Sequence, residues 1–302
     1  MTTSSGRPTA WRAPDKTFID AFVTLAAISA VTEGMVLGTG VVIPIRWPLK
    51  LAQEFSSLSF LNGGKVVAGV GLGFSPAEFA GAGFDVERRE EILVETVAIF
   101  RDAWDDGLVD FHGQVFDVDD VELFPTPVEP IPVVYGGNTP KSIRRAVDHT
   151  DGWYPGRLPM STLEARLRYL EDYAGERASE MHTIIQPLVV VAPTREAAVA
   201  KVPVDEVAHS SGGAKFWLKP PSGEFRTVED LRGLVVCGTP DDVVEQVMEF
   251  HDLGIDELVF DLRLQFDEYE DAHELLGAEV LPALRAALAS PRGATATATT
   301  TA

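Results

Sequence analysis

The sequence predicts an α/β fold in which parallel strands alternate with helices. Apolar runs rich in Val and Ile, such as residues 66–71, lack polar alternation, which indicates a sheet covered on both faces. Each run ends in glycine-rich or polar residues and leads into apolar positions at helical spacing. Repeated units of this kind favour a barrel over an open sheet. In such sheets ligands bind at the carboxyl ends of the strands.

In the first half of the chain, capping residues, proline and glycine indicate where the helices begin and end. Asp20 can cap a helix that Gly34 closes. Pro48 at a first turn and the glycines at 63–64 bound a second helix. Further along, Ile92, Leu93, Val97, Phe100 and Trp104 recur at helical spacing. The expected elements are a helix over 20–33, a strand over 35–43, a helix over 48–62, a strand over 66–71, a helix over 87–104 and a hairpin over 108–128.

The second half continues the same alternation. Asp241 and Asp242 are carboxylates of the kind favoured in a first helical turn. Residues 209–236 are polar and contain Gly and Pro, so we expect a long loop there. The expected elements are strands over 132–135, 152–154, 182–193 and 257–262, and helices over 140–148, 161–174, 194–208, 240–253 and 268–288. The whole chain then has about six strands.

One domain is expected to account for most of the chain. A length of 302 residues fits a single barrel of about 250 residues plus tails. We assign the barrel domain to 17–289, with a polar, loosely attached tail over 1–16 and a low-complexity tail over 290–302. Basic residues precede the apolar stretch after Asp20, as in a signal peptide, but its spacing favours an amphipathic helix.

Composition excludes several classes of function. The formal net charge of −21 argues against nucleic-acid binding and against an anionic membrane as a partner. No apolar run approaches the roughly 18 residues of a membrane span. The single cysteine, Cys237, allows no intrachain disulfide and predicts a cytoplasmic protein. Its apolar surroundings favour packing over a catalytic thiol. The histidines show no metal-ligand spacing, so no metal is expected, and hydrolase and NTPase loop motifs are missing.

Three stretches resemble the luciferase-like monooxygenase family, whose members use flavin or the deazaflavin coenzyme F420. They begin with FVTLAAISAVTEGMVLGTGVVIPIRWPLKLAQEFSSLSFLNGGKVVAGVGLGF, continue with PIPVVYGGNTPKSIRRAVDHTDGWYP, and end with VVCGTPDDVVEQVMEFHDLGIDELVF. Their order along residues 18–284 makes the resemblance specific. It implies a TIM-type (β/α)8 barrel that binds a tricyclic redox ring at the strand ends.

The resemblance implies a set of cofactor-binding residues. The family's non-prolyl cis peptide carries over onto Gly40 and Val41, flanked by Thr39 and Ile43. A second wall carries over onto Leu72, Gly73 and Phe74. The family's phosphate grip carries over onto a turn that opens a helix. Free N–H groups at such a turn attract phosphate, although a tight turn alone would also need its glycines. The residues of this turn are Gly136, Gly137, Asn138, Thr139 and Pro140.

The resemblance departs from the family pattern at two places. Some deazaflavin members carry a carboxylate where Phe74 stands, and its absence here argues against that proton-transfer role. In many deazaflavin relatives the end of the second strand bears an Asp or His beside the ring, and no residue here inherits that role. We also expect the first strand–helix–strand of the barrel to be missing, which would leave unpaired strand edges. Three explanations remain open: a start site placed downstream of the true one, a real short form whose edges a partner subunit or the tail covers, or a decayed copy.

Other residues keep two readings. Arg46 and Trp47 line a substrate pocket or lie in a surface loop. Trp153 and Tyr154 stack near the ring or pack in the core. His112 and His149 are assigned no catalytic role. The leading hypothesis is an oxidoreductase that uses F420, or alternatively FMN, on a small organic substrate, and forms a homodimer. The alternative is a non-catalytic, truncated barrel that binds a flavin or a partner subunit.

Overall fold

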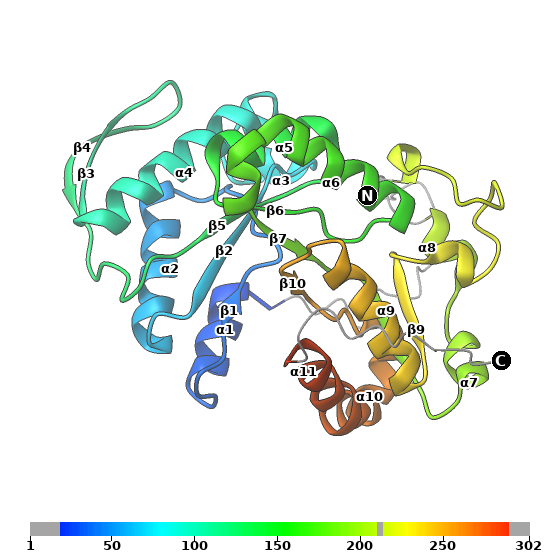
Figure 1. The fold of residues 1–302 in the computed structure, drawn as a ribbon. Helices are drawn as coiled ribbons and strands as arrows, with labels where there is room; N and C mark the ends of the chain where they lie inside the picture. The colour runs from blue at the N-terminus through cyan, green and yellow to red at the C-terminus, as the bar shows by residue number, and fades with distance from the viewer. Residues whose placement is uncertain (1–18, 210–213, 290–302) are drawn as a thin grey trace, which may run out of the picture. The chain divides into compact units, whose positions relative to one another are not determined.

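The computed structural model describes residues 19–209 and 214–289, which form two compact units (Figure 1). The N-terminal unit contains residues 19–186 and 215–218 of this part. The C-terminal unit contains residues 187–209, 214 and 219–289. The expected tails over 1–16 and 290–302 lie outside the described residues.

A parallel sheet forms the centre of the N-terminal unit. Its strands pair in the order β1-β2-β5-β6-β7, and every pairing is parallel. They are β1 (Leu37–Gly38), β2 (Val66–Gly71), β5 (Val133–Gly136), β6 (Gly152–Tyr154) and β7 (His182–Ile185). The helices are α1 (Ala21–Ser29), α2 (Pro48–Asn62), α3 (Pro76–Gly81), α4 (Arg89–Asp105), α5 (Pro140–His149) and α6 (Met160–Ala174). The predicted α/β class with a parallel sheet is therefore confirmed.

The helices begin and end where short polar residues and glycine satisfy free backbone groups. The Asp20 carboxylate accepts hydrogen bonds from the N–H groups of Phe22 and Val23, at 2.9 and 3.2 Å. Pro48 opens α2, and Gly63 ends it with a positive φ of 67°. These caps confirm the predicted helix starts at Asp20 and Pro48.

Aromatic side chains fill the interface between α2 and α4. Phe55 and Phe100 are completely buried, and their ring centroids lie 5.8 Å apart. Trp104 stacks on Phe100 at 4.7 Å and donates its indole N–H to the carbonyl of Ala52, at 3.1 Å. This packing covers one side of the sheet and leaves the carboxyl ends of the strands to the loops.

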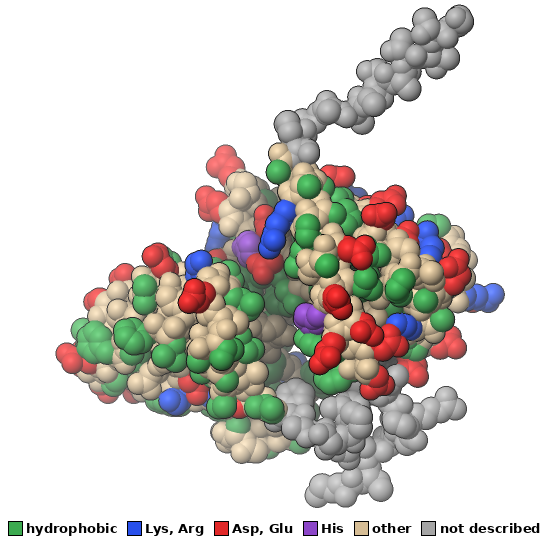
Figure 2. All heavy atoms as spheres, turned by 90° about the horizontal axis from the view of Figure 1, so that it is seen from below, with side chains coloured by type: hydrophobic (Ala, Val, Ile, Leu, Met, Phe, Trp, Pro, Cys, Tyr) green, Lys and Arg blue, Asp and Glu red, His purple; other side chains and the backbone are tan. Residues whose placement is uncertain are grey.

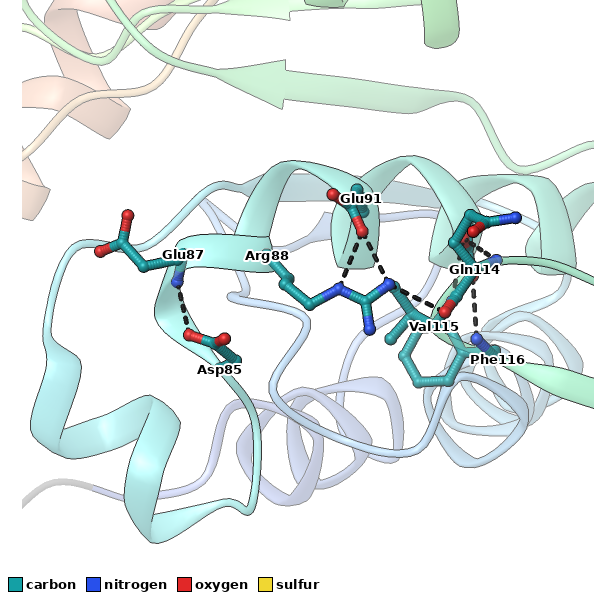
Figure 3. A network of polar contacts seen from close by, with 8 residues as sticks. Asp85, Glu87, Arg88, Glu91, Gln114, Val115 and Phe116 are labelled. Carbon is teal, nitrogen blue, oxygen red and sulfur yellow. Dashed lines mark hydrogen bonds and ion pairs between the residues drawn. The ribbon is translucent and has the colours of Figure 1, made fainter.

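The predicted hairpin is confirmed as the antiparallel pair β3 (Leu108–His112) and β4 (Asp117–Glu122). Its turn is attached to α4 by the Glu95 carboxylate, which accepts from the backbone N–H groups of Gln114, Val115 and Phe116. Figure 3 shows the neighbouring contacts, in which Arg88 donates to Glu91 and to the carbonyl of Gln114.

The C-terminal unit contains the parallel pair β8 (Leu188–Val191) and β9 (Val235–Gly238), and the short strand β10 (Glu257–Leu258). Thr239 and Asp242 form a capping box at the start of α9. The helices of this unit are α7 (Arg195–Val199), α8 (Val204–His209), α9 (Pro240–Asp252), α10 (Tyr269–Leu275) and α11 (Leu281–Ala289).

Four element predictions are wrong in detail, and proline explains three of them. The strand expected over 182–193 is split into β7 and β8 at Pro187, which has no N–H for a ladder. The helix expected over 194–208 breaks before Pro203. The final helix contains a π-helical turn, Leu276–Val280, just before Pro282. The fourth is the helix expected to reach residue 33, which ends at Ser29, where the Ser29 hydroxyl donates to the carbonyl of Ala26.

Other elements were missed or overestimated in length. The loop expected over 209–236 contains α8's last residue and the start of β9, whose four residues are all buried. Helix α3 was not predicted; Ser75 caps it. The strand expected over 35–43 pairs regularly only at β1, and its pairing resumes at an isolated bridge between Val42 and Val70.

The surface is mainly acidic, as the net charge of −21 requires. On the face shown in Figure 2, the described Lys and Arg side chains are scattered among Asp and Glu side chains. Among the helices in the described part of the chain, none combines the length and the hydropathy needed to cross a bilayer.

Candidate functional site

The candidate site lies at the carboxyl ends of the strands of the N-terminal unit. The peptide bond between Gly40 and Val41 is cis, as expected from the family resemblance. A Cβ atom on Gly71 would lie 2.5 Å from a methyl group of Val41, and one on Gly136 would lie 3.0 Å from it. The Val41 side chain therefore rests across the ends of β2 and β5, against two residues that have no side chain.

We call the segment at the Gly40–Val41 cis peptide the bulge. Tyr154 lies against the Gly40 side of this bulge. A Cβ atom on Gly40 would lie 2.7 Å from the Tyr154 hydroxyl oxygen. The Tyr154 hydroxyl donates to the side-chain carbonyl of Gln186, at 2.7 Å, and so joins the end of β6 to the residue that follows β7. Tyr154 is 6% exposed. Tyr154 therefore packs in the core, and its hydroxyl also reaches the candidate site.

Two hydrogen bonds to the Gly69 carbonyl fix the bulge to β2. The Thr39 hydroxyl donates to the carbonyl of Gly69 at 2.7 Å, and the Val42 N–H donates to the same carbonyl at 2.8 Å. A Cβ atom on Gly69 would lie 1.9 Å from the Thr39 carbonyl oxygen, so the two strands approach as closely as only glycine permits. The position of Val41 is thus determined by the strand next to it.

Only part of the second predicted wall, which comprises Leu72, Gly73 and Phe74, lies at the site. Gly73 has a φ of 72°, and a Cβ atom there would lie 2.7 Å from a methyl group of Ile43. Leu72, Gly73 and Ile43 are half-buried, and Ile43 lies against both Gly71 and Gly73. The Phe74 side chain is 92% exposed and therefore does not contribute to this wall.

The turn between β5 and α5 is held from beneath. The Trp153 indole N–H donates to the carbonyl of Gly137 at 2.7 Å, and Trp153 is completely buried. Gly137 has a φ of 152°, and a Cβ atom there would lie 2.5 Å from the Ser142 hydroxyl. Thr139 caps α5 through its hydroxyl, which accepts from the Ser142 N–H at 3.2 Å. Gly136, Gly137, Asn138, Thr139 and Pro140 are all half-buried, as residues that line a ligand would be.

Residues near this edge that had two readings are engaged in structural contacts. Arg46 forms ion pairs with Asp20 and with Glu54, which connect the starts of α1 and α2. The hydrogen bond from Arg46 holds the pKa of Asp20 below its usual range. Trp47 is half exposed and contacts Phe116 edge to face, with centroids 5.6 Å apart. Both residues are therefore involved in packing the loop.

An ion pair between the buried Arg145 and the partly exposed Glu90 was not found from the sequence. The Arg145 side chain, on α5, donates to Glu90 on α4 at 2.7 Å. This hydrogen bond, together with one from Lys141, lowers the pKa of Glu90 to about 2. Arg145 also lies 3.3 Å from the Tyr135 hydroxyl on β5, whose pKa is raised by burial. The three partners come from α4, α5 and β5, so no local sequence pattern indicates that they meet.

Two titratable groups elsewhere carry no assigned chemistry. His112 on β3 forms a 2.6 Å contact with Asp117, which raises the pKa of His112. With Asp110 and Asp119 it forms an exposed group whose ligand atoms lie within 4.8 Å of one another, and we assign it no metal. Burial raises the pKa of Cys237 to about 11, so its thiol is neutral, as expected for a packing residue.

A surface cavity of about 550 Å³ in the C-terminal unit contains none of the predicted residues. Its lining includes Asp230, whose carboxylate accepts hydrogen bonds from the Ser222 hydroxyl and from the backbone N–H groups of Arg226 and Thr227. These contacts fold the loop onto itself and occupy the carboxylate.

Comparison with known proteins agrees with the geometry. The model of the luciferase-like monooxygenase family matches residues 5–257. An F420-dependent glucose-6-phosphate dehydrogenase from Nakamurella multipartita is 29% identical over 277 residues, which cover 87% of this chain and 81% of that protein. An F420-dependent hydroxymycolic acid dehydrogenase from Mycobacterium tuberculosis is 34% identical over 136 residues, which cover 44% and 38%.

Two solved structures illustrate the likeness in fold. An F420-dependent secondary alcohol dehydrogenase in complex with an F420–acetone adduct matches with a TM-score of 0.73 and 22% identity, over 91% of this chain and 87% of that one. The oxygenating constituent of 3,6-diketocamphane monooxygenase from Pseudomonas putida, in complex with FMN, matches with a TM-score of 0.69 and 17% identity, over 87% and 83%. The predicted fold, an α/β fold related to the TIM-type barrel, is confirmed.

Proposed function

Because the chain belongs to the luciferase-like monooxygenase family, we propose that it is an oxidoreductase that binds F420 at the Gly40–Val41 bulge. FMN is the alternative cofactor. Curated relatives named as F420-dependent dehydrogenases favour F420, and an FMN-bound monooxygenase is among the structural neighbours. The substrate is a small organic molecule, and we favour hydride transfer over oxygenation for the same reason.

The observation that carries the proposal is the cradle around Val41. A flat ring needs an apolar support without projecting side chains beside it, and Val41 lies against Gly71 and Gly136 in just such a place. Ile43 lies next to Gly71 and Gly73, and Ile43, Leu72 and Gly73 are all half-buried. The turn from Gly136 to Pro140 lies at the end of β5, where the phosphate on the cofactor's side chain would reach it. The residues present therefore fit a flavin-type cofactor.

The protein's own groups would position the cofactor. When bound, F420 or FMN supplies the redox chemistry, and the chain binds, orients and shields the ring. Val41 would support one face, and the Tyr154 hydroxyl, fixed by Gln186, would hold the underside of the bulge in place. No side chain at this edge is assigned the role of acid or base.

A homodimer is part of the proposal. In the N-terminal unit β1 is the first strand in the sheet order, and α1, α2 and the residues that follow α1 expose large apolar side chains. Examples are Val23 on α1, Val31 after it, and Phe60 and Leu61 on α2, each between 59% and 83% exposed. Sedimentation at several concentrations tests this: one species at the monomer mass throughout would contradict it. We also propose a cytoplasmic location, which rests on the single cysteine.

Cofactor titration tests the proposed function. Purified chain is titrated separately with F420 and FMN, and binding is followed by cofactor fluorescence and by the melting temperature. A ligand that binds only the native state raises stability by about 2.7 kcal/mol at one hundred times its Kd. We expect saturable binding with F420 tighter than FMN. If neither cofactor binds to folded protein, the non-catalytic alternative replaces the enzyme hypothesis.

A further inference from the structure

Arg166 on α6 reaches the turn that precedes α5. Its Nε donates to the carbonyl of Asn138, at 3.1 Å, and the side chain is half-buried there. Helices α5 and α6 pack against each other (Figure 1), so this contact connects the second helix to the turn that opens the first. The guanidinium group is thus fixed beside Asn138 with its two terminal nitrogens left over for another acceptor.

The charge of Arg166 has no counter-charge within the described residues. Two other arginines of this unit differ in this respect, since Arg46 pairs with Asp20 and Glu54, and Arg145 pairs with Glu90. No carboxylate in the described parts of the chain lies within 4.0 Å of Arg166, and burial alone lowers its pKa. A half-buried guanidinium group that faces no carboxylate keeps its charge available for an anion from outside the described residues.

The turn itself offers further donors to such an anion. Among the described residues, the backbone N–H groups of Gly137 and Asn138 donate to no acceptor. Their carbonyl oxygens are instead occupied, by Trp153 and by Arg166 respectively. The carbonyl oxygens of this turn are therefore occupied, while its N–H groups remain available as hydrogen-bond donors next to the guanidinium group of Arg166.

We propose that Arg166 binds the phosphate ester of the cofactor and positions it on the turn at Gly137 and Asn138. This inference rests on the proposed function and names a residue that it does not require. The same phosphate chemistry occurs in the phosphodiester of F420 and in the phosphate of FMN. Arg166 acts as a positioning residue, because it touches the end of the cofactor remote from the ring.

The experiment compares ligands that differ in the phosphate. Riboflavin lacks the phosphate of FMN, and the free deazaflavin chromophore lacks the phosphodiester and tail of F420. Affinities of all four are measured for the wild type, for Arg166→Gln and for Arg168→Gln. Arg168 is a matched control, because it lies on the same helix and is exposed, with only a 4.0 Å contact to Glu164.

We expect Arg166→Gln to weaken binding of the two phosphate ligands by about tenfold to a hundredfold. Riboflavin and the free chromophore should change by less than about twofold, and Arg168→Gln should leave all four unchanged. Arg166→Lys should recover part of the loss, since it restores the charge without the planar fork. Melting curves confirm that each variant is folded.

The outcomes separate this inference from the proposed function. Wild-type protein that binds none of the four ligands overturns both. Wild-type protein that binds phosphate ligands, with equal losses for phosphate and phosphate-free ligands in Arg166→Gln, overturns only the role of Arg166. A loss confined to the phosphate ligands supports it.

Discussion

The Glu95 carboxylate on α4 holds the turn of the β3–β4 hairpin by accepting hydrogen bonds from three backbone N–H groups. Glu95→Ala would leave these three N–H groups without their acceptor. Donor–acceptor distances run from 2.6 to 3.1 Å. Hydrogen bonds to a charged group contribute about 1.5–3 kcal/mol each, but the N–H groups of Gln114 and Val115 are only partly buried and can rehydrate. Only the Phe116 N–H is buried. We therefore expect a loss of about 2–4 kcal/mol in the free energy of unfolding.

Urea denaturation followed by circular dichroism measures this loss as a shift in midpoint. Glu91→Ala is the matched control, because Glu91 lies one turn earlier on the same helix, is 52% exposed, and pairs only with Arg88 (Figure 3). That pair should contribute under about 1 kcal/mol. If the two variants unfold within about 0.5 kcal/mol of each other, hydrogen bonding by Glu95 does not anchor the hairpin.

Three further predictions concern pH, the thiol and the bulge. The pKa of Glu90 is lowered to about 2, so the stabilisation by its pair with Arg145 is present above pH 4.5 and is lost as pH falls toward 2. In Arg145→Met, acid titration of the melting temperature should show a smaller step, because only Lys141 then remains paired with Glu90. Cys237 is buried with its pKa raised to about 11, so a thiol reagent at pH 8 should modify it only after unfolding; fast modification of native protein would contradict this. Gly40→Ala places a methyl group 2.7 Å from the Tyr154 hydroxyl and should weaken F420 binding about tenfold, whereas Gly81→Ala, with open space around it, should not.

Much of the fold was predictable because its signals are local. Asp20, Pro48 and Thr239 mark helix starts through groups within one turn, and the run at 66–71 is apolar throughout. The breaks were harder to place. Pro187 lies inside a continuous apolar run, and the run alone does not say whether the chain continues in one strand or two. The proline was the available signal.

In the candidate site, too, some residues could be predicted from the sequence and others could not. Gly40, Gly136 and Gly137 were found through the family resemblance, and their need for glycine is visible only where Val41, Tyr154 and Ser142 approach them. β9 was missed because its four buried residues follow a polar, glycine-containing segment. Arg166 carried no signal, since a helical arginine is normally a solvated residue and its isolation from carboxylates is a property of the fold.

Methyl NMR of Val41 tests the central claim, that the cofactor ring lies on the Gly40–Val41 bulge. Valine methyl groups are labelled with ¹³C, Val41 is assigned by Val41→Ile, and F420 is added to saturation. The ring should shift the Val41 methyl resonances, while those of Val121 on the hairpin strand β4 should stay in place. Saturable F420 binding with unmoved Val41 methyl resonances would show that the ring binds elsewhere, and would contradict the proposed site.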